Sequence, residues 1–117
     1  MTFYKKKKSK YKNKITTVDN IKFHSKLEAS HYLQLKVLEK QGLIKELELQ
    51  PAYEIYVNDL KVCKVILDFE FFDNEKNKHR YVDSKGVYTS ESRLKHKLVE
   101  AIYGIDVEIW KGKKISF

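Results

Sequence analysis

The spacing of apolar residues changes along the chain, and each spacing predicts a different element. From Leu27 to Leu38 apolar residues recur every three or four positions, which is the helical period. Ser25 with Glu28 three residues later is a capping-box pattern, and Gly42 stands where a helix commonly ends in a left-handed residue. We therefore predict a helix between Ser25 and Gly42 with this buried stripe: Leu27, Ala29, Tyr32, Leu35 and Leu38.

After Gly42 the apolar residues form short runs or alternate with polar ones, and both patterns are typical of β-strands. Asn58-Asp59 is a hairpin signal, residues 73–77 form a polar turn, and residues 15–23 are expected to be extended. The strands predicted after the first helix cover residues 44–49, 53–57, 61–72, 79–85 and 105–110.

A second helical period lies near the C-terminus. Residues 90–103 are predicted to form a helix that ends at Gly104, with Leu94, Leu98, Ala101 and Ile102 in its buried stripe. The order helix, three or four strands, helix and strand predicts an α/β fold in which helices flank a mixed β-sheet. No repeat or linker divides residues 15–117, so we expect one domain there.

The composition is that of a globular protein. Of 117 residues, 42% are hydrophobic and 13% aromatic, and no apolar run approaches the roughly 18 residues of a membrane span. The basic N-terminus lacks the apolar region of a signal peptide, and the single cysteine, Cys63, cannot form an intramolecular disulfide. We expect a cytoplasmic location, no membrane partner, and a buried, unreactive Cys63.

Positive charge is concentrated at the N-terminus. Of the 24 lysines and arginines, seven lie in residues 1–14, which contain no acid, and the other 17 nearly balance the 16 acids. A flexible basic arm on a balanced domain suits binding to a phosphate backbone, and Tyr4 and Tyr11 could stack on bases. The alternative is a solvated tail that aids solubility. The arm residues expected to contact DNA are Lys5, Lys6, Lys7, Lys8, Lys10 and Lys12.

Two acids and a lysine in the middle of the chain point to phosphodiester hydrolysis. Asp68 closes an apolar stretch, and Asp83-Ser84-Lys85 stands fifteen residues later at the end of another predicted strand. Asp83 and Lys85 are two apart, so both point to the same face of that strand. Two carboxylates and the Ser84 backbone carbonyl can hold Mg²⁺, while Lys85 orients the attacking water or steadies the pentavalent phosphorus. The alternatives are a strand-end acid at Asp68 and a surface ion pair between Asp83 and Lys85.

Further residues are candidate accessory groups. Glu28 could cap its helix, reach a second metal ion, or do both, and Gln50 either lies near the site or is an ordinary strand-end amide. Arg93 and Lys97 either contact phosphates or form a solvated basic face. The four histidines show neither zinc-site spacing nor a partnered nucleophile, and the single Glu28-x-x-His31 pair is too little for a di-metal bundle. The lack of a Gly-rich phosphate loop argues against ATP or GTP hydrolysis.

Taken in order, these blocks resemble the PD-(D/E)XK nuclease superfamily. More narrowly, residues 23–29 (FHSKLEA), 47–51 (LELQP), 68–69 (DF) and 83–86 (DSKG) are similar to a family of small phage proteins. That family is often catalogued only as of unknown function and is linked to Holliday junction resolvase-like endonucleases. The similarity covers roughly residues 10–110.

This resemblance implies a restriction-endonuclease-like core with a defined set of roles. Asp68 and Asp83 would be metal ligands, Lys85 the catalytic lysine and Glu28 an accessory acid, with Gln50 near the site. The proline that names the superfamily is replaced by Leu67. Because resolvases cut two opposed strands, the resemblance also implies a homodimer.

The resulting hypothesis is a Mg²⁺- or Mn²⁺-dependent DNA endonuclease of phage origin. It would be specific for branched DNA such as Holliday junctions and would work in the cytoplasm of the bacterial host during recombination or packaging. Two alternatives remain open: a DNA-binding module that keeps the nuclease fold without cutting, and an RNA-binding protein that uses Tyr4, Tyr11 and the arm lysines.

Overall fold

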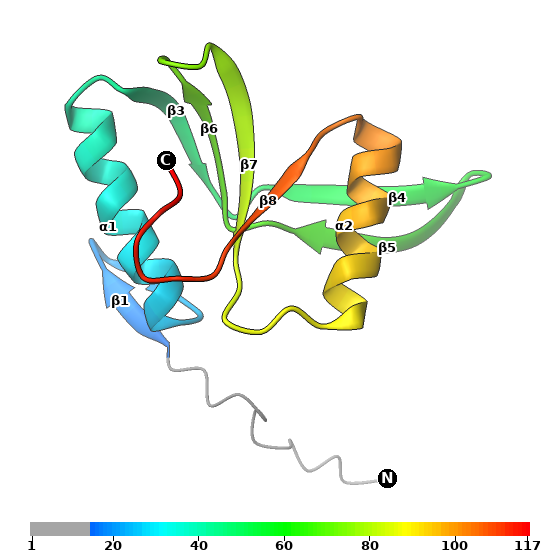
Figure 1. The fold of residues 1–117 in the computed structure, drawn as a ribbon. Coiled ribbons are helices and arrows are strands. Elements are labelled where there is room, and N and C mark those ends of the chain that lie inside the picture. Colours follow the sequence, from blue (N-terminus) through cyan, green and yellow to red (C-terminus); the bar gives the residue numbers. More distant parts are fainter. Residues whose placement is uncertain (1–14) are drawn as a thin grey trace, which may run out of the picture.

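A computed structural model describes residues 15–117, which form two α-helices and eight β-strands (Figure 1). The predicted basic arm, residues 1–14, lies outside the described residues. The elements in chain order are β1 (Thr16–Val18), β2 (Ile21–Phe23), α1 (Lys26–Lys40), β3 (Ile44–Leu49), β4 (Ala52–Val57), β5 (Leu60–Ile66), β6 (Phe69–Asp73), β7 (Lys78–Ser84), α2 (Ser90–Tyr103) and β8 (Val107–Trp110).

A mixed four-stranded sheet with the strand order β3-β6-β7-β8 lies at the centre of the fold. Strand β6 is antiparallel to β3 and β7, whereas β8 is parallel to β7. Helix α2 supplies the crossover connection that a parallel pair needs. The predicted α/β class, a mixed sheet flanked by helices, is therefore confirmed. Strands β1–β2 and β4–β5 form two separate antiparallel hairpins.

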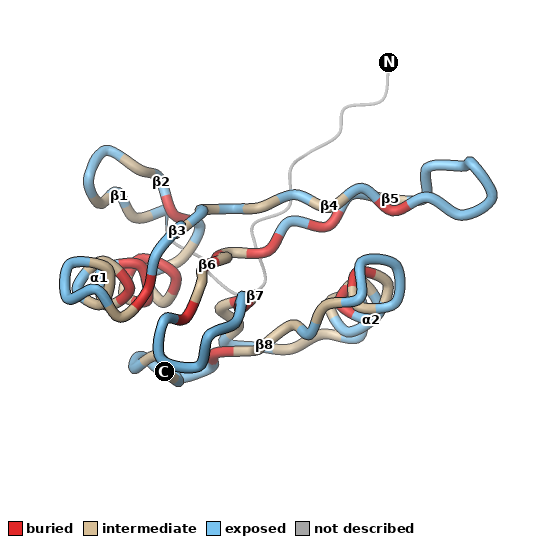
Figure 2. Tube along the Cα trace, turned by 90° about the horizontal axis from the view of Figure 1, so that it is seen from above, coloured by how far each residue is buried: buried red, intermediate tan, exposed pale blue. Residues whose placement is uncertain are grey.

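The two faces of the sheet carry different cores, because side chains along β7 alternate between them. Val82 joins Leu35 and Phe71 in the core that α1 covers. Tyr81 packs against the second core, which contains Val99 of α2. Figure 2 shows α1 and α2 on opposite sides of β6 and β7. Consecutive residues of β7 therefore meet different helices.

The predicted capping residues define both ends of α1. The Ser25 hydroxyl accepts the N–H of Glu28 at 3.0 Å, and the Glu28 carboxylate accepts the N–H of His24 at 3.3 Å. At the other end Gly42 has a φ of +75°, and the N–H of Leu43 bonds back to the last turn at 3.0 Å. Because these groups satisfy the free N–H and C=O groups of the helix ends, the predicted boundaries are confirmed.

The prediction of one strand over residues 61–72 is wrong. The chain divides this run at Leu67 and Asp68 into β5 and β6, which belong to different sheets. The N–H of Leu67 donates to the Pro51 carbonyl at 3.0 Å, and the next N–H, that of Asp68, donates to the Val82 carbonyl at 3.1 Å. The backbone therefore changes its hydrogen-bond partner within two residues. An apolar run does not reveal this change, because the strands on either side of it both bury apolar side chains.

The buried stripe predicted for α2 is also largely wrong, although the bounds of the helix are as predicted. Leu94 is 61% exposed and Ile102 is 45% exposed, and Ala101 is exposed as well. The fully buried residues of α2 are His96 and Val99. The helix is oriented so that His96 faces the sheet. The spacing of apolar residues cannot identify a buried position that a polar residue occupies.

Other predictions differ in detail. Residues 15–23 form the β1–β2 hairpin, in which Asp19 and Asn20 have left-handed φ values of 52° and 63° that suit a tight turn. Cys63 is only partly buried and lies at the margin of the core beside α2. Among residues 15–117, no helix is long and apolar enough to cross a membrane.

Candidate functional site

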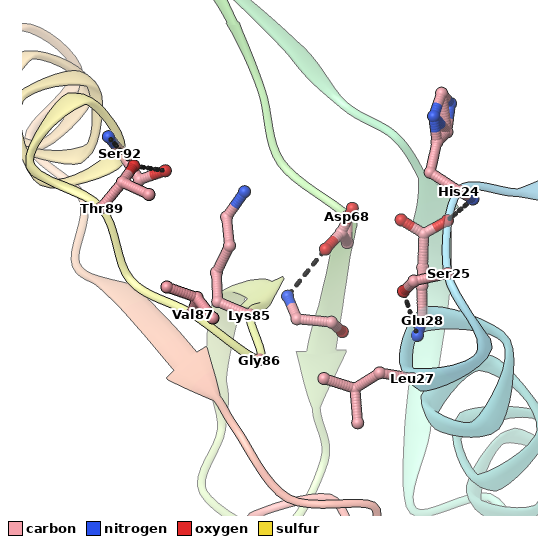
Figure 3. Close-up of a pocket in the computed structure, with 11 residues that line it drawn as sticks. His24, Ser25, Leu27, Glu28, Asp68, Lys85, Gly86, Val87, Thr89 and Ser92 are labelled. Atoms are coloured by element: carbon pink, nitrogen blue, oxygen red, sulfur yellow. Dashed lines mark hydrogen bonds between the residues drawn. The ribbon is translucent and has the colours of Figure 1, made fainter. Parts of the chain in front are cut away.

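A cleft of about 470 Å³ opens between the start of α1, the β5–β6 junction and the segment that connects β7 to α2. Glu28, Asp68, Ser84 and Lys85 all line it. Figure 3 shows Lys85 and Glu28 approaching Asp68 from opposite sides. Four residues that the sequence analysis selected are thus brought together from three separate segments.

Asp68 occupies the turn where the chain leaves β5 for β6. Its Oδ2 accepts the backbone N–H of Ser84 at 2.7 Å, which joins this turn to the end of β7. Burial raises the pKa of the Asp68 carboxyl far above its usual range, and the adjacent carboxyl groups of Glu28 and Asp83 raise it further. Among residues 15–117 no lysine, arginine or histidine forms an ion pair with Asp68. Asp68 therefore has two carboxyl neighbours and no cationic partner of its own within residues 15–117.

Asp83 and Lys85 point to the same face of β7, as their spacing predicted. The Asp83 Oδ2 lies 3.6 Å from the Lys85 Nζ and 2.7 Å from the His96 Nε2. Burial alone would raise the pKa of Asp83, but the hydrogen bonds from His96 and Asp68 and the charge of Lys85 outweigh it and lower that pKa. Asp83 is only 3% exposed, so the surface ion pair proposed as its alternative role does not describe it.

Glu28 has the predicted capping role, and its side chain also lies at the candidate site. It caps α1, and it is also a buried residue that lines the cleft beside Asp68. Burial of an acid is costly unless its oxygens are satisfied. Here the backbone N–H of His24 donates a hydrogen bond to the Glu28 Oε1 at 3.3 Å.

Two buried histidines next to the cleft were missed as site residues. His31 of α1 contacts the Ser84 hydroxyl, and His96 of α2 contacts Asp83. Burial lowers the pKa of His31, although a hydrogen bond to the Gly112 carbonyl partly offsets this effect. The spacing of three residues between Glu28 and His31, which places both on one helix face, was a usable signal for His31. His96 had none, because it falls outside the apolar stripe predicted for α2.

Other predicted residues do not line the cleft. The side chain of Gln50 is exposed, and only its backbone N–H reaches the site, where it donates to the Asp68 carbonyl at 2.9 Å. Arg93 is exposed and stacks over the Tyr88 ring at 5.2 Å, and Lys97 is exposed on α2. The arm residues Lys5, Lys6, Lys7, Lys8, Lys10 and Lys12 lie outside the described residues.

A second depression of about 280 Å³ lies on the other side of Lys85. Lys85 and Ser92 line both depressions, so the two meet at these residues. The predicted site residue Asp83 lines this second depression and not the cleft, together with Lys64 of β5 and Lys95 of α2, which sequence reasoning did not select. These lysines are far apart in the sequence and come together only in the fold.

The donor atoms at the site suit a hard divalent cation. The carboxylates of Asp68 and Asp83 and the carbonyl of Ser84 are oxygen donors, and Mg²⁺ typically binds one or two protein carboxylates while it keeps several waters. Within residues 15–117, no group of three or more His, Cys, Asp or Glu side chains is placed to hold a metal ion. The excess of carboxyl groups around Asp68 nevertheless fits an added positive charge.

The chain belongs to the family described as "Protein of unknown function (DUF1064)", whose match covers residues 8–116. No curated protein and no solved structure matches the chain.

Proposed function

We propose that this protein is a Mg²⁺- or Mn²⁺-dependent DNA endonuclease that hydrolyses phosphodiester bonds. The observation that supports this most directly is that Asp68 lines the cleft, Asp83 lines the adjoining depression and Lys85 lines both, with 3.6 Å between the Asp83 Oδ2 and the Lys85 Nζ. Acids that can hold a divalent cation beside a lysine that can serve a phosphate are the groups that this hydrolysis requires.

Each residue at the site has a role in this proposal. Asp68, Asp83 and the Ser84 carbonyl would hold the metal ion, which when bound neutralises phosphate charge and makes a coordinated water more acidic. Lys85 would donate a hydrogen bond to the scissile phosphate or to the attacking water. Glu28, on the other side of Asp68, would accept a hydrogen bond from that water and so orient it.

Positive charge around the cleft supports DNA as the substrate. Lys64, Lys85 and Lys95 line the adjoining depression, where they could follow the phosphates of a strand that crosses the site. Arg93 and Lys97 on α2 and the arm lysines would add contacts farther away. This part of the proposal predicts binding that weakens steeply with salt.

Branched DNA, phage origin, a homodimer and the cytoplasm of a bacterial host complete the proposal. Their support is the sequence resemblance to resolvase-like endonucleases. A panel of single-stranded, duplex, flap and four-way substrates with Mg²⁺ and with Mn²⁺ tests the substrate, and we expect the four-way junction to be cut fastest. Light scattering during gel filtration tests the oligomer.

A DNA-binding module without nuclease activity is the second candidate. The observation that favours it is that His96 and Lys85 both contact one oxygen of Asp83, so protein groups alone can satisfy this carboxylate. Tight, salt-dependent binding to DNA without Mn²⁺ binding in calorimetry would support this candidate over the nuclease.

The decisive experiment compares cleavage and DNA binding in matched variants of the full chain. Asp83→Ala and Lys85→Ala should abolish cleavage and still bind DNA, because the other lysines around the cleft remain. Lys40→Ala, in the last turn of α1, is the control and should cut at the wild-type rate. Wild-type cleavage by both site variants would refute the assigned site.

A further inference from the structure

Two buried histidines hold consecutive residues at the end of β7 from its two faces. His31 belongs to α1 and His96 to α2, and they are 0% and 4% exposed, respectively. His31 meets the Ser84 hydroxyl, and His96 meets the Asp83 carboxylate. Each helix therefore contributes one imidazole to the segment that carries the proposed metal ligands.

The hydrogen bonds of His31 determine which ring nitrogen carries the proton. The Nε2 lies 2.6 Å from the Gly112 carbonyl, which can only accept, so this nitrogen is the donor. In the neutral ring, Nδ1 then accepts the Ser84 hydroxyl proton across 2.6 Å. The ring also packs edge-on against Trp110, with 5.6 Å between the ring centres. Ser84 is thus tied to a histidine that cannot easily rotate.

His96 has an equally complete set of contacts. Its Nε2 donates to the Asp83 Oδ2 at 2.7 Å, and its Nδ1 lies 2.9 Å from the Tyr88 hydroxyl. The Tyr88 ring stacks on the imidazole with 5.3 Å between the centres, and Arg93 covers the same tyrosine. Because His96 and Lys85 both approach Oδ2, the Asp83 carboxylate is held in one orientation.

We propose that His31 and His96 are positioning residues, which hold the Ser84 backbone and the Asp83 carboxylate in the geometry that binds the metal ion. This inference rests on the proposed nuclease function. Hydrogen bonds from outside the ligand set orient metal ligands in this way, and their removal typically weakens metal binding. A purely structural role would instead affect folding and leave the metal affinity of the folded protein unchanged.

The first test measures Mn²⁺ binding to the full chain by calorimetry. His96→Leu should weaken binding roughly 10- to 100-fold, the usual cost of losing such a partner. His96→Gln keeps an N–H donor for Asp83 and should recover most of the loss. Tyr88→Phe removes only the outer hydrogen bond and should weaken binding several-fold, and it serves as the test if His96→Leu does not fold. The matched control is His79→Gln, which changes an exposed histidine on β7, the strand that carries Asp83. This variant should bind Mn²⁺ as tightly as wild type.

The second test asks whether His31 acts through Ser84. His31→Leu and Ser84→Ala remove the same hydrogen bond from opposite sides, and Ser84→Ala keeps the backbone carbonyl. Each single variant should lower the Mn²⁺ affinity. The double variant should bind Mn²⁺ as tightly as the weaker-binding single variant, because two substitutions that remove the same hydrogen bond do not have additive effects. Fully additive losses would overturn the assignment for His31.

Affinity and cleavage together separate this inference from the proposed function. If the wild type binds Mn²⁺ but cuts no substrate, the nuclease proposal fails, and the affinities still decide the roles of the histidines. If the wild type cuts DNA and the folded His96 and Tyr88 variants bind Mn²⁺ as tightly as wild type, only the positioning roles fail. A wild type that binds no Mn²⁺ overturns both.

Discussion

The backbone N–H of Ser84 donates a 2.7 Å hydrogen bond to the Asp68 carboxylate. This bond joins the turn between β5 and β6 to the end of β7, two segments that lie in different parts of the sequence. Since Asp83 precedes Ser84, the same contact brings the second acid towards the first. The candidate site depends on this junction and not on either strand alone.

Asp68→Asn should stabilise the metal-free protein, by about 1–2 kcal/mol as is common when a site residue that is costly to the fold is removed. The folded-state pKa of Asp68 is raised, so the folded protein keeps a proton that the unfolded chain releases. Wild-type stability therefore falls as pH rises above the ordinary Asp value of about 4, and the advantage of the variant grows with pH.

Urea unfolding in EDTA at a series of pH values above about 4 measures the difference in stability between wild type and Asp68→Asn. The control is Asp106→Asn, which changes an exposed aspartate. Added Mg²⁺ should raise the stability of the wild type and not that of Asp68→Asn. An Asp68→Asn protein that is less stable than wild type at pH 8 would contradict the prediction.

Lys64→Ala and Lys95→Ala should each weaken DNA binding to a similar extent for every DNA sequence. Each should also reduce the slope of log affinity against log salt by about 1, because each lysine neutralises roughly one phosphate. Fluorescence anisotropy with Ca²⁺ in place of Mg²⁺ measures the slope across a series of salt concentrations. Lys40→Ala should retain the wild-type slope, and unchanged slopes in the first two variants would exclude the depression beside β5 from the DNA path.

Arg80→Leu should destabilise the fold by about 3–5 kcal/mol, the cost of leaving a buried partner charge unpaired. The Arg80 guanidinium lies 3.1 Å from Asp73 and 2.6 Å from Glu108, and Asp73 is completely buried. Arg80→Lys should restore little, because an ammonium group cannot bond both acids in the same geometry. Urea unfolding tests this, and a loss below about 1 kcal/mol would show that the buried pair is not needed.

Protonation of Asp73 should contribute to the unfolding of the protein at low pH. Burial alone would raise the pKa of Asp73, but the backbone N–H groups of Lys76 and Glu75 and the Arg80 guanidinium outweigh it and lower that pKa. A lowered folded-state pKa adds stability above the unfolded value of about 4, and this contribution is lost as pH falls through the folded value. Asp73→Asn should be less stable at pH 7 and should show a flatter decline below pH 4 in urea titrations.

The orientation of α2 can be tested by two substitutions. Leu94→Ser should change the free energy of unfolding by less than about 0.5 kcal/mol, because Leu94 is exposed. Val99→Ala should cost about 2 kcal/mol, because it leaves a cavity in the core between α2 and the sheet. The reverse order of losses would favour the apolar stripe that the sequence suggests.

Much of the local structure follows from residues that act within a few positions of each other. Ser25, Glu28 and Gly42 define α1, and Gly104 ends α2, because a cap or a left-handed residue satisfies the backbone of its own helix end. The same holds for Asp83 and Lys85, whose common face follows from the alternation of a strand. These features need no tertiary information.

The assembly of the site does not follow from short-range geometry, because it depends on which distant segments pack together. The break at Leu67 and Asp68 arises because the backbone exchanges partners between sheets, and the chain alone does not specify the partner. His31 and His96 face the site because their helices pack on opposite faces of β7, and Lys64 and Lys95 meet for a similar reason. The helix ends and the common face of Asp83 and Lys85 follow from the amino-acid sequence, because they depend on short-range geometry. The acids, histidines and lysines around that pair are set by the packing of distant segments, because burial and long-range hydrogen bonds select them.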